Sequence, residues 1–135
     1  MDKAFKADLT KNWSIEVTPQ GGEKIMDFDL LLPVGTSVNI TSLPGATQYD
    51  SSALIERLVG QGMNPVPHVA VRGIASNKDL INQLTSYQRL GVKEILAIGG
   101  DYSEALGPFS NTSDLIETGI FEDYGIKRLG VAGHP

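Results

Sequence analysis

Two segments of the chain carry nearly the same phrase. Residues 90–101 are LGVKEILAIGGD, and residues 124–135 are YGIKRLGVAGHP. In each, a glycine (Gly91 or Gly125) is followed by a β-branched residue, a lysine and a short apolar run that ends in glycine and a polar residue. Repetition of this kind indicates a fold assembled from similar supersecondary units.

The first copy of the phrase follows a stretch with helical periodicity. Leu80, Leu84 and Tyr87 recur at the spacing of one helix face, which predicts a helix over residues 77–90 with a polar cap at position 76 or 77. Gly91 suits the left-handed position that ends a helix. The apolar run EILAI is then expected to form a strand.

The second copy predicts the same order of elements. Thr112 or Ser113 would open a helix that Gly125 closes, and RLGVA would be the strand that follows. Earlier in the chain, SSALIERLVGQG has one apolar helical face, and GGEKIMDFDLLLP gives a short helix at best. The segments WSIEV, TSVNIT and PVPHVAV are expected to be strands, so that strands begin near residues 13, 36, 66, 94 and 128.

Alternation of strands and helices at this spacing predicts an α/β fold with parallel strands joined by right-handed crossovers. An open doubly wound sheet and a (β/α)8 barrel of the TIM type both fit. We favour the barrel, because polar residues lie at or near the ends of several strands, and the first strand lacks a glycine-rich nucleotide-binding turn. A barrel needs eight units, so residues 1–135 are expected to form one domain containing its first five strands, as an incomplete, open barrel.

Charge and composition narrow the possible partners. The 135 residues carry a net charge of −5. Proteins that bind nucleic acid usually carry a strongly basic surface, which this composition does not provide. There is no cysteine, and no apolar run approaches the roughly 18 residues of a membrane span. We therefore expect no disulfide, no nucleic-acid partner and no membrane partner, with a cytoplasmic location as the default.

Four polar residues near strand ends are candidates for chemistry. Glu16 lies within an apolar strand, where burial would raise the pKa of its carboxyl group toward that of a general acid. His68 has apolar neighbours and is equally compatible with a satisfied core histidine. Asp101 follows two glycines and begins a long loop, and is either functional or a simple cap. Together with His134 these residues contain metal-ligand types, but no pair has close ligand spacing, so a metal-dependent barrel enzyme is the weakest alternative.

Several segments, in order, resemble the methylenetetrahydrofolate reductase family over about residues 13–135, the N-terminal half of a family member. SIEVTP resembles its first-strand motif, and SVNIT lies where the family has a strand ending in Thr-Tyr-Gly. The later matches are PHVAV to a Pro-His-Leu-Thr segment, AIGGD to Leu-Arg-Gly-Asp, NTSDL to Ala-Ser-Asp-Leu, and GVAGHP to the strand before a Gly-His-Pro-Glu turn.

The resemblance implies a (β/α)8 flavoprotein. Such an enzyme passes a hydride from NAD(P)H through FAD to 5,10-methylenetetrahydrofolate and yields 5-methyltetrahydrofolate, in the one-carbon and methionine pathway. It implies that Glu16 is the acid that protonates folate N5 and that Asp101 tunes the flavin electrostatically. It also implies flavin contacts by Asn39, His68, Gly100, Asp101, Thr112 and His134.

Some positions depart from the family pattern. Gly99 stands where the family usually has arginine, and Ile40 where it has tyrosine, while Asn39, Thr112 and His134 are not the commonest residues at their positions. A non-redox partial barrel that binds a folate or pterin is therefore the alternative function. We also expect a homo-oligomer or dependence on a C-terminal half.

Overall fold

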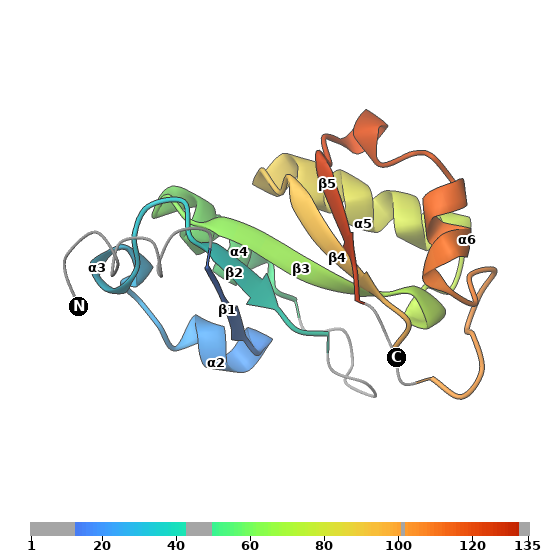
Figure 1. Cartoon of the computed structure of the whole chain (residues 1–135), viewed down its shortest axis with the longest axis horizontal. Helices are drawn as coiled ribbons and strands as arrows, with labels where there is room; N and C mark the ends of the chain where they lie inside the picture. Colours follow the sequence, from blue (N-terminus) through green and yellow to red (C-terminus); the bar gives the residue numbers. More distant parts are fainter. Residues whose placement is uncertain (1–12, 43–49, 101, 133–135) are drawn as a thin grey trace.

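In the computed structural model, which describes residues 13–42, 50–100 and 102–132, five strands form one parallel sheet (Figure 1). The strands lie in the order of the chain, β1-β2-β3-β4-β5, without the reversal that marks a doubly wound sheet. The predicted α/β class with parallel strands is confirmed. The strands are β1 (Ser14–Val17), β2 (Ser37–Ile40), β3 (Asn64–Ala70), β4 (Glu94–Ile98) and β5 (Arg128–Val131).

Helices and short helical turns connect the strands. The helix expected after the second strand is α4 (Ser52–Gly60), and the short helical content expected after the first strand is divided between α2 (Pro19–Glu23) and α3 (Phe28–Leu31). No helix within the described ranges combines the length and the apolar character that crossing a bilayer requires. The remaining helical elements are η1 (Val71–Gly73), α5 (Asn77–Leu90), α6 (Thr112–Glu117) and η2 (Glu122–Tyr124).

The first repeated phrase is a helix stop followed by a strand, as predicted. The Ser76 hydroxyl accepts a hydrogen bond from the amide of Asp79 (3.1 Å) at the start of α5. Gly91 adopts φ 87°, and the amide of Val92 donates to the carbonyl of Tyr87 (3.0 Å). The local cap signals therefore fixed both ends of this helix.

The second copy has the same glycine turn as the first, but the helix before it is different. Gly125 adopts φ 76°, and the amide of Ile126 donates to the carbonyl of Phe121 (3.1 Å), matching the bond at the first copy. The expected single helix is wrong, however, because α6 ends at Glu117, before Gly119, whose φ of 65° is left-handed. The cap is also one residue earlier than expected, since the Asn111 side chain accepts from the amide of Asp114 (2.9 Å).

The two faces of the sheet differ in what covers them. Alternate strand residues such as Val38, Val69 and Ile95 are buried in one apolar core together with helix residues such as Leu54 and Leu84. The opposite face, which we call the open face, bears mostly polar side chains, and its buried Val66 is not part of that core. Its other residues include Glu16, Ser37, Asn39, Asn64, His68, Glu94, Leu96 and Arg128.

Candidate functional site

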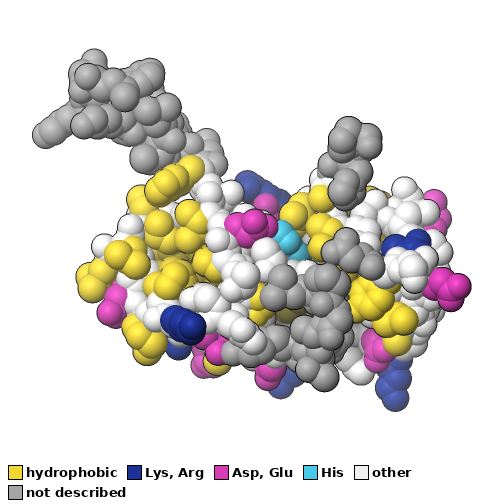
Figure 2. Space-filling view, turned by 90° about the horizontal axis from the view of Figure 1, so that it is seen from below, with side chains coloured by type: hydrophobic (Ala, Val, Ile, Leu, Met, Phe, Trp, Pro, Cys, Tyr) yellow, Lys and Arg dark blue, Asp and Glu magenta, His cyan; other side chains and the backbone are white. Residues whose placement is uncertain are grey.

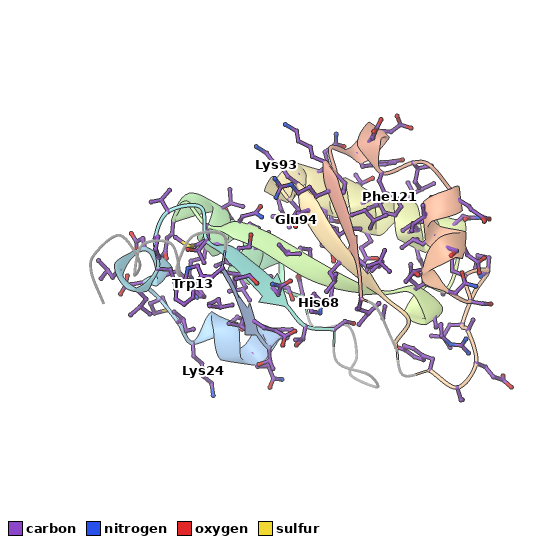
Figure 3. The ribbon with its side chains drawn as sticks, in the orientation of Figure 1. Trp13, Lys24, His68, Lys93, Glu94 and Phe121 are labelled. Atoms are coloured by element: carbon purple, nitrogen blue, oxygen red, sulfur yellow. The ribbon has the colours of Figure 1, made fainter. Side chains whose placement is uncertain are left out.

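Three of the predicted site residues lie together on the open face. Glu16 and Asn39 are paired in register on β1 and β2, near the carboxyl ends of those strands. The side-chain oxygen of Asn39 lies 3.3 Å from Nε2 of His68, and Oε1 of Glu16 lies 3.9 Å from the same nitrogen. In Figure 2 histidine atoms reach the surface beside acidic atoms, and Figure 3 places His68 over the sheet. Three successive strands thus contribute one polar cluster.

The hydrogen bonds of Asn39 define the protonation of His68. The Asn39 amide nitrogen donates to the carbonyl of Ile15 (3.4 Å), which leaves the amide oxygen facing the imidazole. An amide oxygen only accepts, so Nε2 of His68 carries the proton in this pair. The other ring nitrogen, Nδ1, is then the acceptor of the neutral ring.

The environment keeps the His68 ring neutral near pH 7. Its side chain is only 8% exposed, and burial lowers the pKa of the imidazole below its usual 6.5, while the Glu16 carboxylate acts in the opposite direction. Burial is the larger of the two effects. A neutral, oriented imidazole can donate and accept hydrogen bonds at a ligand without bringing a positive charge.

Glu16 is not buried as its apolar sequence context suggested. Its side chain is 62% exposed, because β1 is an edge strand of the described sheet and Glu16 points to the open face rather than to the helices. The apolar neighbours that suggested burial, Ile15 and Val17, pack on the opposite face. An exposed carboxylate beside His68 remains able to exchange a proton with a ligand on the open face.

Two glycines, Gly99 and Gly100, follow β4 at its carboxyl end. Gly100 adopts φ 87°, and a Cβ atom at this position would lie 3.2 Å from Cβ of Ala70. At Gly99 a Cβ would meet no atom of the described residues within 4 Å. Asp101 and His134, two of the predicted site residues, lie outside the described residues.

The remaining predicted positions differ in their relation to this cluster. Thr112 is the first residue of α6, and no described contact links it to Asn39 or His68. Ile40 is buried in the core on the helix-covered side of the sheet. Its difference from the family tyrosine therefore affects core packing rather than the open face.

Sequence reasoning did not identify the role of Arg72. Its guanidinium donates to the carbonyl oxygens of Tyr102 (2.9 Å), Ser103 (2.8 Å) and Ser110 (3.2 Å), while its own carbonyl accepts from the amide of Leu106 (2.8 Å). One side chain thus holds both ends of the long loop that follows β4. The length of that loop was the only sequence signal that an organising contact was needed.

Thr41 directly follows the last residue of β2. Its hydroxyl is buried and has no hydrogen-bond partner among the described residues. An unpartnered buried hydroxyl is costly, and a ligand or water at this end of β2 would satisfy it. Thr41 therefore marks a second polar position close to Asn39.

Metal binding has no support from the described residues. Among them, no three His, Cys, Asp or Glu side chains are grouped closely enough to hold an ion. Two members of the set considered from the sequence, Asp101 and His134, lie outside this part of the chain.

Comparison with protein-family models finds no match for the chain. The site is therefore described by its own geometry: an oriented neutral imidazole, an exposed carboxylate and an amide, next to a glycine pair and an unpartnered hydroxyl.

Proposed function

We propose that this chain forms the N-terminal part of a (β/α)8-type barrel that reduces 5,10-methylenetetrahydrofolate to 5-methyltetrahydrofolate with NAD(P)H and FAD. The observation that carries the proposal is the meeting of Glu16, Asn39 and His68 on the open face, near the carboxyl ends of three successive strands. Barrel enzymes place their chemistry at that end. The sequential parallel order of the strands is the order a barrel requires.

The described residues fit a flavin on three grounds. His68 and Asn39 offer polar contacts on the open face, no described atom lies within 4 Å of a Cβ placed at Gly99, and the buried Thr41 hydroxyl has no described partner. Asn39, His68 and the backbone at Gly100 would hold the cofactor. Bound FAD would supply hydride transfer between NAD(P)H and the folate.

The residues of this chain would control the proton. Conversion of the methylene bridge to a methyl group consumes one hydride and one proton. The Glu16 carboxyl group would give the proton that opens the bridge, and its exposure on the open face allows a folate to reach it. His68, neutral and fixed by Asn39, would orient the bound molecule through its hydrogen bonds.

Absorption spectroscopy with added FAD tests the proposal. We expect weak FAD binding by this chain alone, which His68→Ala and Asn39→Ala each weaken about a further tenfold, since each removes a hydrogen-bonding group from the site. Asn82→Ala, an exposed position of α5, is the matched control and should bind FAD as the parent chain does. Folate binding without any flavin binding would favour the binding-only alternative and overturn the redox proposal.

A further inference from the structure

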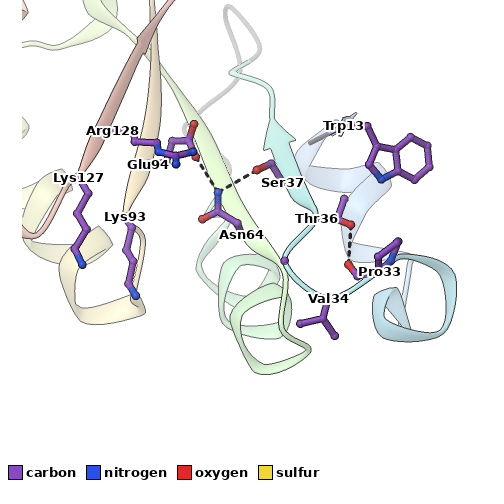
Figure 4. A pocket seen from close by; sticks show the side chains of 11 residues that line it. Trp13, Pro33, Val34, Thr36, Ser37, Asn64, Lys93, Glu94, Lys127 and Arg128 are labelled. Carbon is purple, nitrogen blue, oxygen red and sulfur yellow. Dashed lines mark hydrogen bonds between the residues drawn. The ribbon is translucent and has the colours of Figure 1, made fainter. Parts of the chain in front are cut away.

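A groove lies at the other end of the sheet, where the strands begin (Figure 4). Its volume is about 610 Å³, and it lies away from the Glu16–Asn39–His68 cluster, which is near the strand ends. We call it the amino-end groove. Its polar lining includes Ser37, Asn64, Lys93, Glu94, Lys127 and Arg128.

The repeated phrase of the sequence places two lysines at the rim of the amino-end groove. Lys93 and Lys127 occupy the same position in the two copies, two residues after Gly91 and Gly125. The amide of Lys127 donates to the carbonyl of Lys93 (2.7 Å), so the two residues are neighbours at the starts of β4 and β5. Their side chains point the same way in Figure 4.

A third cation lies next to this pair. The amide of Arg128 donates to the same Lys93 carbonyl (3.1 Å), and Arg128 also lines the groove. Within the described ranges, no hydrogen bond or ion pair engages the side chains of Lys93, Lys127 or Arg128. Their charges are therefore available to a ligand.

The one carboxylate in the lining is engaged by an amide rather than by these cations. Asn64 donates through its side-chain nitrogen to Glu94 (2.8 Å) and to the hydroxyl of Ser37 (3.1 Å). Three cationic groups against one carboxylate leave the groove positive, on a chain whose net charge is −5. A local positive potential on an acidic protein attracts anions selectively to that place.

We propose that the amino-end groove binds a small anion that carries two or more phosphate or carboxylate groups. The two lysines, whose side chains run parallel in Figure 4, suit several negatively charged oxygens at once, because ammonium groups donate charge-assisted hydrogen bonds to phosphate and carboxylate alike. Arg128, whose side chain lies beside Glu94, adds a third positive charge to the lining. Ser37 and Asn64, at the starts of β2 and β3, add polar groups to the lining. This site is separate from the folate and flavin proposal and does not depend on it.

Isothermal titration with inorganic pyrophosphate and with citrate tests the inference. We expect saturable binding of at least one, with the tighter of the two showing whether phosphate or carboxylate is preferred. The double substitution Lys93→Ala with Lys127→Ala should weaken binding about tenfold or more, as expected for lost charge-assisted hydrogen bonds. Glu94→Gln should tighten it, since a negative charge leaves the groove while the new amide oxygen can still accept from Asn64.

The matched control is Lys24→Ala with Lys78→Ala, which changes the net charge equally at exposed positions outside the groove lining. It should leave binding unchanged. Both lysines of the groove are also exposed, so their truncation leaves the core intact, and a thermal melt checks this. Absence of saturable binding of both anions, or equal loss in the control and groove variants, would overturn the proposal.

Discussion

The side-chain oxygen of Asn39 lies 3.3 Å from Nε2 of His68, which joins two neighbouring strands through their side chains on the open face. Because the amide nitrogen of Asn39 is turned to the carbonyl of Ile15, the contact selects one tautomer of the imidazole. In the candidate site, Nε2 of His68 is therefore the donor and the Asn39 oxygen the acceptor before any ligand binds.

Replacing that amide by a carboxylate should change the titration of His68. In Asn39→Asp, a negative charge at hydrogen-bond distance favours the imidazolium, so the pKa of His68 should rise relative to the parent chain. NMR titration of the ring protons measures it, in a His134→Gln background that leaves one histidine signal. Asn82→Asp adds the same charge on the exposed surface of α5 and should leave the pKa of His68 in place. A pKa that stays constant or falls in Asn39→Asp would contradict the contact.

His68 should also make stability depend on pH. Its pKa in the folded chain lies below the usual 6.5, so between these two values the unfolded chain binds more protons than the folded one. The contribution of the neutral His68 ring to the free energy of unfolding is fully present above pH 6.5. It is lost as the pH falls through the pKa of His68 in the folded chain. Urea unfolding at a series of pH values should show this decline.

The matched variant for the pH experiment is His68→Gln, which keeps a hydrogen-bond donor and removes the titration. The difference in free energy of unfolding between parent and variant should shift in favour of the parent as the pH rises through this range. A difference that is constant with pH, or that moves in the opposite direction, would mean that burial does not govern the His68 ring.

Local signals in the sequence predicted both ends of α5 correctly, but they mispredicted the ends of α6 and the burial of Glu16. The Ser76 cap and the Gly91 stop depend on neighbouring residues alone, and both are found. The burial of Glu16 depends on what covers each face of the sheet, and an apolar strand sequence does not specify which side that is. Gly119 was overlooked as a helix end because the apolar pattern continues to Gly125 across it.

Long-range contacts explain the rest of what was missed. Arg72 has carbonyl partners at Tyr102 and Ser110, and backbone carbonyls carry no residue-specific signal in a sequence. From the sequence, Asn39 and His68 were expected only to lie near the ends of strands. The hydrogen-bond distance between their side chains depends on the register of β2 and β3, which the sequence does not specify. The equivalent positions of Lys93 and Lys127 in the repeat were visible in the sequence. Their location beside a groove became apparent only from the folded structure.

Arg72 should contribute measurably to stability. Arg72→Ala removes three hydrogen bonds from a cationic donor to carbonyl oxygens of the loop after β4. We expect a loss of about 2 kcal/mol in the free energy of unfolding, since bonds to charged groups contribute about 1.5–3 kcal/mol when buried and less when partly exposed. Urea denaturation measures it. Arg89→Ala, exposed in the last turn of α5, should change stability by less than about 0.5 kcal/mol. Equal effects would show that the loop does not depend on Arg72.

The edges of the sheet should promote self-association. Within the described residues, β1 and β5 each pair with a strand on one side only, and such edges present unpaired backbone groups to other chains. Val131, 47% exposed on β5, lies at one edge. Sedimentation velocity over a range of concentrations should show association that Val131→Lys weakens about tenfold, because a charged side chain on an edge strand disfavours strand addition.

Ile116 offers the comparison that isolates the edge effect. It is 45% exposed on α6, so Ile116→Lys replaces an apolar side chain of similar exposure by the same charge away from the edges. If association proceeds through the β5 edge, Ile116→Lys should sediment like the parent chain while Val131→Lys shifts toward the monomer. A parent chain that stays monomeric at every concentration, or two variants that behave alike, would show that the edges do not drive assembly and that any association depends on general surface hydrophobicity.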